Sequence, residues 1–288
     1  MNLSMKIIKN ITEMQNWSRH YRCENPDQKI GFIPTMGFLH EGHLSLIKQA
    51  VESCQCIVVS IFVNPFQFNN PDDLKNYPRN LERDILLLNG LDQKIDILFI
   101  PDSDDVYKNG RPELIMDYPD ITNKLCGKTR AGHFNGVLTI VHNLFMWIKP
   151  HVAIFGLKDY QQYLLIKKMT NDLHLDVEIK AGQLIRENDG LAMSSRNSRL
   201  SSEEKNRALI ISQTLFKVKN EFESGNNKVL HLKNILQNNL SHLEIDYASL
   251  YHSETLEELN EQDNASGALV AVAVYIGKVR LIDNILLN

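Results

Sequence analysis

The stretch IGFIPTMGFLHEGH, residues 30–43, decides the fold of this chain. Its first five residues are almost all apolar, as expected for a short strand that is covered on both faces. Two glycines and two histidines then lead into Leu44, Ile47 and Val51, whose spacing predicts a helix over residues 43–53. A buried strand that turns directly into a helix is the first half of a parallel β-α-β unit.

The same alternation of strand and helix continues to about residue 180. Further strands are predicted at residues 56–63, 95–100 and 151–155, with a weaker one at 176–180, and helices at 81–88 and 161–169. Polar residues or glycine follow the strands at once, as at Thr35, Asn64 and Gly156. Because ligands of an open parallel sheet bind beyond the carboxyl ends of its strands, we expect these loops to line one crevice.

The pattern changes near Arg186. Ser201 and Glu204 have the spacing of a capping box at the start of a helix, and a second amphipathic helix is predicted at residues 229–240. Strands are then predicted at 244–250, 268–276 and 279–282. The predicted fold class is therefore α/β, with a Rossmann-like parallel-sheet domain at residues 1–185 and a smaller α+β domain with an antiparallel sheet at 186–288.

The composition of the chain argues against nucleic-acid and membrane partners and against a disulfide scaffold. The 288 residues include 31 Lys and Arg against 35 Asp and Glu, a net charge of −4, so we expect no nucleic-acid partner. The longest apolar stretch, residues 137–148, is too short to span a bilayer, and the first residues do not resemble a signal peptide. Four cysteines are too few for a disulfide scaffold, which leads us to expect reduced thiols in a cytoplasmic protein.

The segment HEGH, residues 40–43, carries the chemistry. A helix start presents unpaired N–H groups and a partial positive charge, and imidazole N–H groups beside it add donors for a phosphate. The zinc-binding helical motif needs histidines four apart, whereas His40 and His43 are three apart and Gly42 interrupts them. The third reading, histidines that only cap or pack, explains a lone histidine better than two with two glycines. We favour phosphate binding.

Several further segments occur in a fixed order with this one: SIFVNPFQF at 60–68, YPR at 77–79, AGHFNGV at 131–137, FGLKDYQQ at 155–162, GLAMSSRN at 190–197 and RLIDN at 280–284. Together with PTMGFLHEGH they closely resemble the pantothenate synthetase (pantoate–β-alanine ligase) family of nucleotidyltransferases, which carry an HIGH-like motif. The resemblance implies an enzyme that uses ATP and Mg²⁺ to convert pantoate to pantoyl adenylate, releasing pyrophosphate. The amine of β-alanine then displaces AMP to give pantothenate. It also implies a cytoplasmic homodimer with a closing C-terminal domain.

The resemblance also implies the site residues. His43 matches the family's proton donor, and His40 and Lys158 complete the predicted catalytic set. Gln67 and Gln162 match the pantoate-binding glutamines, and Gln67 also matches the β-alanine contact. The predicted ATP-binding residues are Met36, Gly37, Phe38, Leu39, His40, Glu41, Gly42, His43, Gly156, Leu157, Lys158, Asp159, Ile185, Met193, Ser194, Ser195 and Arg196.

This chain departs from the family pattern at two positions. Leu157 stands where a polar residue is usual, and Asn135 where a basic residue is usual, so Arg130 is a possible substitute for a lost carboxylate guide. His133 is open between a structural role and a substrate contact. Asp84 is a candidate for Mg²⁺ by position, but no metal ligand is assigned, because Mg²⁺ is usually held by few protein groups besides phosphates.

Two rival functions share some of these features. Another nucleotidyltransferase would share the HEGH region, but it would not require both the FVNPFQF and KDYQQ segments. A non-catalytic ATP-binding protein of the same fold would be expected to lose His43, Lys158 or the SSR loop, and this chain keeps all three.

Overall fold

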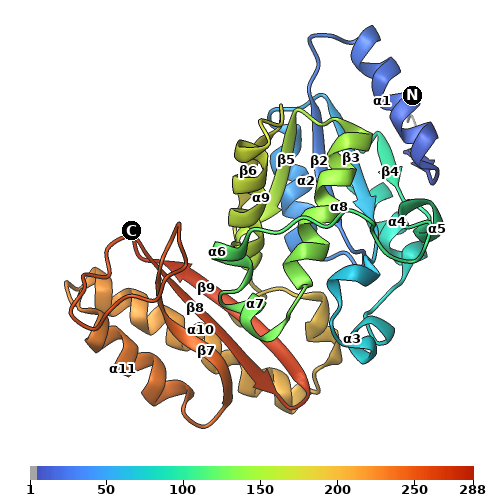
Figure 1. Ribbon diagram of the computed structural model, residues 1–288. Coiled ribbons are helices and arrows are strands. Elements are labelled where there is room, and N and C mark those ends of the chain that lie inside the picture. The colour runs from blue at the N-terminus through green and yellow to red at the C-terminus, as the bar shows by residue number, and fades with distance from the viewer. Residues whose placement is uncertain (1–4) are drawn as a thin grey trace. The chain divides into compact units, whose positions relative to one another are not determined.

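The computed structural model describes residues 5–288, which form two compact units (Figure 1). The first unit comprises the described part of Met1–Tyr118, together with Arg130–Leu157 and Gln162–Gln183. The second comprises Pro119–Thr129, Lys158–Gln161 and Leu184–Asn288. Residues 1–4 of the predicted N-terminal domain lie outside the described residues. The predicted domains, 1–185 and 186–288, are divided where the pattern of predicted elements changes, and this division stays a prediction.

The first unit is built on a parallel sheet. Within residues 5–288 it has six strands in the order β1-β4-β3-β2-β5-β6. Because the order reverses between β2 and β5, the loops after these two strands diverge, which is where open α/β sheets bind ligands. The strands are β1 (Lys6–Ile8), β2 (Ile30–Thr35), β3 (Cys56–Ile61), β4 (Ile97–Phe99), β5 (Val152–Gly156) and β6 (Glu178–Gly182).

Helices cover both faces of this sheet, which explains why its inner strands are apolar throughout. On one face, α2 (Glu41–Val51) contributes Ile47 to a buried cluster with Ile33 of β2. On the other, α8 (His133–Ile148) places Phe145 at 6.3 Å, ring centre to ring centre, from Phe32. Successive strand residues point to opposite faces, so α2 and α8 lie on opposite sides of β2 (Figure 1).

The remaining helices of the first unit are shorter or lie near the sheet edges. They are α1 (Ile11–Glu24), the 3₁₀ helix η1 (Pro65–Gln67), α3 (Pro71–Lys75), α4 (Leu81–Asn89), α5 (Ser103–Val106) and α9 (Tyr160–Asp172), whose first two residues belong to the second unit.

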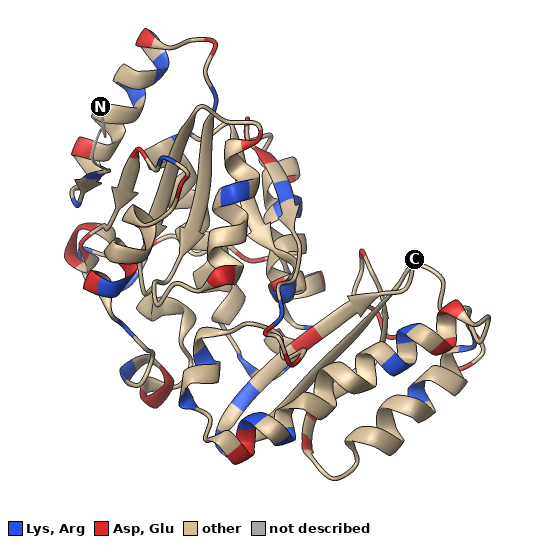
Figure 2. Ribbon diagram, turned by 180° about the vertical axis from the view of Figure 1, so that it is seen from behind, with Lys and Arg blue, Asp and Glu red and all other residues tan. Residues whose placement is uncertain are grey.

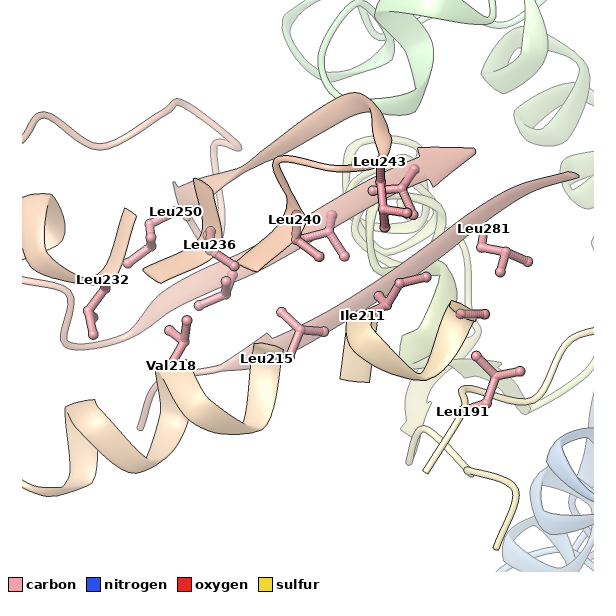
Figure 3. Close-up of a cluster of buried hydrophobic side chains, with 14 of the residues drawn as sticks. Leu191, Ile211, Leu215, Val218, Leu232, Leu236, Leu240, Leu243, Leu250 and Leu281 are labelled. Atoms are coloured by element: carbon pink, nitrogen blue, oxygen red, sulfur yellow. The ribbon is translucent and has the colours of Figure 1, made fainter. Parts of the chain in front are cut away.

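The second unit is an antiparallel sheet with helices packed against it. Its strands, β7 (Glu244–His252), β8 (Ala268–Ile276) and β9 (Val279–Leu286), are ordered β7-β8-β9. Ser201 caps α10 (Ser202–Glu223) in the predicted capping box with Glu204. Leucines of α10, of α11 (Val229–Leu240) and of the strands point into one buried cluster (Figure 3). The short elements are α6 (Pro119–Thr122), α7 (Cys126–Thr129), η2 (Leu157–Asp159), which begins in the first unit, and η3 (Ser195–Arg199).

The two sheets confirm the predicted fold class, a Rossmann-like α/β part and a smaller α+β part. Lys and Arg are interspersed with Asp and Glu along the elements of both units (Figure 2). The predicted apolar stretch 137–148 lies within α8. Within residues 5–288, no helix has both the length and the apolar character that crossing a membrane requires.

Candidate active site

The loop between β2 and α2 is held in an unusual backbone conformation. Gly37 has φ of 78° and Phe38 has φ of 51°, both in the left-handed region. A Cβ on Gly37 would lie 3.0 Å from the Ile61 side chain and 3.1 Å from Oδ2 of Asp84. Glycine is therefore required here for space as well as for conformation. The left-handed turn directs the next residues into the start of α2.

Asp84 of α4 holds this loop in place. Its side chain is 1% exposed, and its two oxygens accept hydrogen bonds of 2.7 Å from the backbone N–H groups of Phe38 and Leu39. Arg83 donates to the Leu39 carbonyl at 2.9 Å and lies over the Phe38 ring. A buried carboxylate that accepts two amide protons is a loop anchor. The structure thus gives Asp84 a role other than that of the Mg²⁺ ligand suggested by its position.

His40 and His43 lie together at the start of α2. His40 is the N-cap, and its Nδ1 accepts from the N–H of Gly42 at 3.2 Å. Nδ1 of His43 accepts from the N–H of His40 at 3.3 Å, and the two rings are 4.1 Å apart. An imidazole nitrogen that accepts carries no proton, so the proton of each neutral ring is on Nε2. The backbone therefore selects the tautomer in which Nε2–H is a donor beside the positive end of a helix.

Gln67 lies in η1, after β3, and is 7% exposed. Its Nε2 lies 2.9 Å from Sδ of Met36, so a predicted pantoate-binding residue contacts a predicted ATP-loop residue. Asn64, the residue before η1, holds η1 through three hydrogen bonds. Its Nδ2 donates to Oε1 of Gln67 and to the carbonyl of Gly136, and its Oδ1 accepts from the Tyr107 hydroxyl. Asn64 is 1% exposed, so this set of bonds orients the glutamine amide.

The GHFNGV segment supports η1 from the start of α8. Nε2 of His133 lies 3.0 Å from the Arg130 guanidinium, which can only donate. Its Nδ1 therefore carries the proton and donates to the Gln67 carbonyl at 2.7 Å. A Cβ on Gly136 would lie 2.7 Å from backbone atoms of Phe66 and Gln67, so only glycine allows this close packing. These contacts favour the structural role for His133.

The structure shows the surroundings of the two positions, 135 and 157, at which this chain departs from the family pattern. Asn135 donates from Nδ2 to the carbonyl of Met116 at 3.0 Å. Leu157, the first residue of η2, is half-buried. Arg130, considered as a substitute for a basic residue at 135, contacts His133.

Gln161 and Gln162 begin α9 and have different surroundings. Gln161 is buried and bonds three backbone groups of the segment 121–126, which makes it a structural residue. Gln162, predicted to bind pantoate, is half-buried. Lys158 and Asp159 precede them, with Nζ of Lys158 at 3.8 Å from the Asp159 carboxylate. The Lys158 side chain is 19% exposed, whereas that of Asp159 is 51% exposed.

The remaining predicted ATP residues lie on a hairpin of the second unit and the turn that follows it. Arg186 pairs with Ala192 as an antiparallel bridge, and the N–H of Met193 donates to the Ile185 carbonyl at 3.0 Å. Ser194 caps η3, its Oγ accepting from the N–H of Arg196 at 3.2 Å, and Ser195 is buried. Serines and an arginine at a short helix start are suitable donors for phosphate oxygens.

The described residues offer no preformed metal site: within 5–288 there is no group of three or more His, Cys, Asp or Glu side chains placed to hold an ion. The alternative reading of HEGH as a zinc motif is also disfavoured, because Nδ1 of each histidine accepts a backbone N–H.

Comparison with known proteins identifies the family. The pantoate–β-alanine ligase family matches residues 6–286. This chain belongs to the pantoate–β-alanine ligase family. The pantothenate synthetase of Fervidobacterium nodosum is 42% identical over 286 residues, which cover 99% of this chain and 100% of that protein. That of Thermosipho africanus is 42% identical over 285 residues, covering 98% and 100%.

Solved structures of the pantoate–β-alanine ligase family have the same fold. Pantothenate synthetase from Thermus thermophilus aligns with a TM-score of 0.88 at 36% identity, over 98% of this chain and 99% of that one. Pantoate–β-alanine ligase from Francisella tularensis, complexed with β-γ ATP and β-alanine, aligns with a TM-score of 0.78 at 37% identity, over 98% and 97%. The predicted family, and with it the prediction that the chain is a ligase, are confirmed.

Three residues that support the candidate site of this ligase have no role that was predicted from the sequence. Asn64, Gly136 and Asp283 lie in the quoted segments, but their partners are distant in sequence. Gly136 directly precedes the apolar stretch 137–148, and its close approach to Phe66 and Gln67 is seen only in the structure. For Asn64 and Asp283 no local signal was available.

Proposed function

We propose that this chain catalyses the ATP-dependent condensation of pantoate with β-alanine to pantothenate, through pantoyl adenylate. The observation that carries the proposal is the start of α2, where Nδ1 of each histidine accepts a backbone N–H, an arrangement that leaves Nε2–H as the donor. In a chain of this family, that arrangement supports binding and activation of ATP phosphates. The ATP and β-alanine named in the Francisella tularensis complex support the same substrates here.

The reaction requires two displacements. An oxygen of the pantoate carboxylate attacks the α-phosphorus of ATP, the bond to the bridging oxygen breaks, and pyrophosphate leaves. The carboxylate charge is thereby neutralised, so its carbon becomes a better electrophile. The amine of β-alanine then attacks that carbon, AMP leaves with the transferred oxygen, and the nitrogen loses a proton.

Negative charge builds on the β- and γ-phosphates during the first step, so donors aimed at them lower its barrier. We assign this role to Nε2–H of His40 and His43, to the ammonium group of Lys158, and to the Ser194–Arg196 turn. Proton donation by His43 is one form of this stabilisation. Arg196 suits two phosphate oxygens at once, because its guanidinium donates in a fork.

Gln67 and Gln162 are proposed to bind pantoate, which carries a carboxylate, two hydroxyls and two methyls. The Nε2 of Gln67 donates to the thioether sulfur of Met36, and a thioether sulfur is a weak acceptor. A hydroxyl or carboxylate oxygen of the substrate would be a better partner. Gln67 is also the proposed β-alanine contact, which would place the incoming amine beside the acyl group.

Mg²⁺ fits this proposal through ATP rather than through a protein cage, because the described residues lack a metal-binding cluster. When bound to the phosphates, it would offset part of their charge. We further propose that the protein is cytoplasmic and forms a homodimer, as the family resemblance implies.

Exchange of labelled pyrophosphate into ATP tests the proposal. We expect exchange when pantoate is present and β-alanine is absent, and net AMP formation only when both are added. Close analogues of pantoate that lack the carboxylate serve as controls and should give no exchange. Exchange that proceeds without pantoate, or AMP formation that is independent of pantoate, would overturn the proposed function.

A further inference from the structure

The RLIDN segment, residues 280–284, matched the family but has no part in the proposed chemistry. All five of its residues lie in β9 of the second unit, which pairs with β8 in the antiparallel sheet. Successive residues of a strand point to opposite faces, so Asp283 and Asn284 reach different neighbours. Those neighbours are the two segments of the second unit that hold predicted phosphate-binding residues.

Asp283 binds Arg186 in a buried ion pair. Its side chain is 3% exposed, and its two oxygens accept from the two terminal nitrogens of Arg186 at 2.6 and 3.0 Å. The same guanidinium lies 4.9 Å from the centre of the Phe216 ring. Burial raises the pKa of Asp283, and the Arg186 hydrogen bonds oppose that rise. Such a two-pronged pair fixes the direction of the arginine as well as its charge.

Arg186 in turn shapes the hairpin that leads to the Ser194–Arg196 turn. Its guanidinium donates to the Gly190 carbonyl at 3.1 Å, across the hairpin loop. Its backbone pairs with Ala192, and Leu191 between them is buried in the cluster of the second unit (Figure 3). The hairpin is therefore anchored on β9 through Asp283, just before the turn begins.

Asn284 holds the other segment. Its Nδ2 donates to the backbone carbonyl of Lys158 at 2.9 Å. The positive charge of Lys158 also lowers the pKa of Asp283, though less than the Arg186 hydrogen bonds do. Two adjacent residues of β9 thus contact both segments.

We propose that Asp283 and Asn284 are positioning residues that set Lys158 and the Ser194–Arg196 turn at a fixed spacing for one polyphosphate chain. The proposal rests on the proposed function, which makes ATP the ligand of these segments. Neither residue needs to touch the substrate. Each acts through the backbone or side chain of a neighbour, so the consequence of losing it is a mispositioned donor rather than a missing one.

The test measures binding without turnover. The variants are Asp283→Asn, Asn284→Ala and Arg186→Lys, which retains the charge but not the fork. Asp246→Asn is the matched control, because Asp246 forms a second buried pair with Arg280, at 2.6 and 2.9 Å, in the same sheet. Calorimetry with ATP, with inorganic tripolyphosphate and with pantoate is carried out on variants whose folded fraction has been checked by thermal melting.

We expect the first three variants to bind ATP and tripolyphosphate about tenfold more weakly or worse, with unchanged binding of pantoate, while the control binds all three like the wild type. Equal losses for all ligands, or no selective loss for phosphate, would show a merely structural role and overturn the proposal. If Asp283→Asn does not fold, the binding data for Asn284→Ala and Arg186→Lys decide whether the proposal holds. Failure of the proposed function itself would appear separately, as a wild-type protein that binds tripolyphosphate but makes no pantothenate.

Discussion

Replacing Asp84 with Asn tests whether a buried carboxylate holds the loop before α2. The carboxylate accepts two N–H groups at 2.7 Å each, from Phe38 and Leu39. An amide of the same shape has one oxygen, so one N–H keeps a weaker, neutral partner and the other meets an NH₂ group. A buried unpaired N–H costs about 1–3 kcal/mol, and replacing the charged acceptor of the other bond costs roughly 1 kcal/mol more.

The expected loss in free energy of unfolding is therefore about 2–4 kcal/mol, a fall in the melting temperature on the order of 10 °C. The same change frees the backbone that leads into His40 and His43. We expect pantoate-dependent pyrophosphate exchange, measured well below the melting temperature, to fall about tenfold or more because these donors are displaced.

Asp96→Asn is the control. Asp96 accepts from the N–H of Ile57 at 2.9 Å, but it lies at the amino ends of β3 and β4, away from the carboxyl ends that face the loop. The Asp96→Asn protein should be less stable than the wild type but should keep the wild-type rate of pyrophosphate exchange. An Asp84→Asn protein with wild-type melting and exchange would refute the reasoning. The reasoning would also be refuted if Asp96→Asn lost as much exchange activity as Asp84→Asn.

The other predictions use simpler measurements. His43→Ala and Lys158→Ala should each lower the single-turnover rate of adenylation about a hundredfold or more; a near-wild-type rate in both would contradict their roles. Burial raises the pKa of Cys56 to about 12, so at about pH 8 only about one thiol in ten thousand is ionised, and a thiol reagent should modify exposed Cys23 long before Cys56. Burial lowers the pKa of His151, whose Nδ1 accepts from the N–H of Ile30, so its contribution to stability is present above about pH 6.5 and is lost as the pH falls through its lowered pKa. His151→Asn should therefore flatten the dependence of the unfolding midpoint on pH between about 7 and 5; an unchanged slope would contradict this.

Elements with a clear period were predictable from sequence. The first strand was predicted at 30–34 and is found at Ile30–Thr35, and the helix 229–240 is found as Val229–Leu240. β1 and α1 were not predicted: β1 has three residues, too few to show a period. α8 was not predicted as a helix because most of its 16 residues are buried, so no polar face marks the turn of the helix.

The local structure of the candidate site was predictable where its residues are neighbours in sequence. The histidines of HEGH and the SSR turn form local structures, so their spacing carried the information. The residues that hold these local structures in place are distant from them in the sequence. Asp84 lies 45 positions from Leu39, Asp283 lies 97 from Arg186, and Asn284 lies 126 from Lys158. A single sequence gives no signal for hydrogen bonds across such separations. Many polar residues stand in similar local sequence surroundings, so nothing marks which of them is the partner.

Transfer of oxygen from pantoate to AMP tests the central claim most directly. Pantoate labelled with ¹⁸O in its carboxylate is incubated with ATP, β-alanine and the protein, and the products are analysed by mass spectrometry. Because the adenylate joins a carboxylate oxygen to the α-phosphorus, we predict one labelled oxygen in each AMP and none in pyrophosphate. Label in pyrophosphate or inorganic phosphate, or AMP that carries no label, would contradict the acyl-adenylate route.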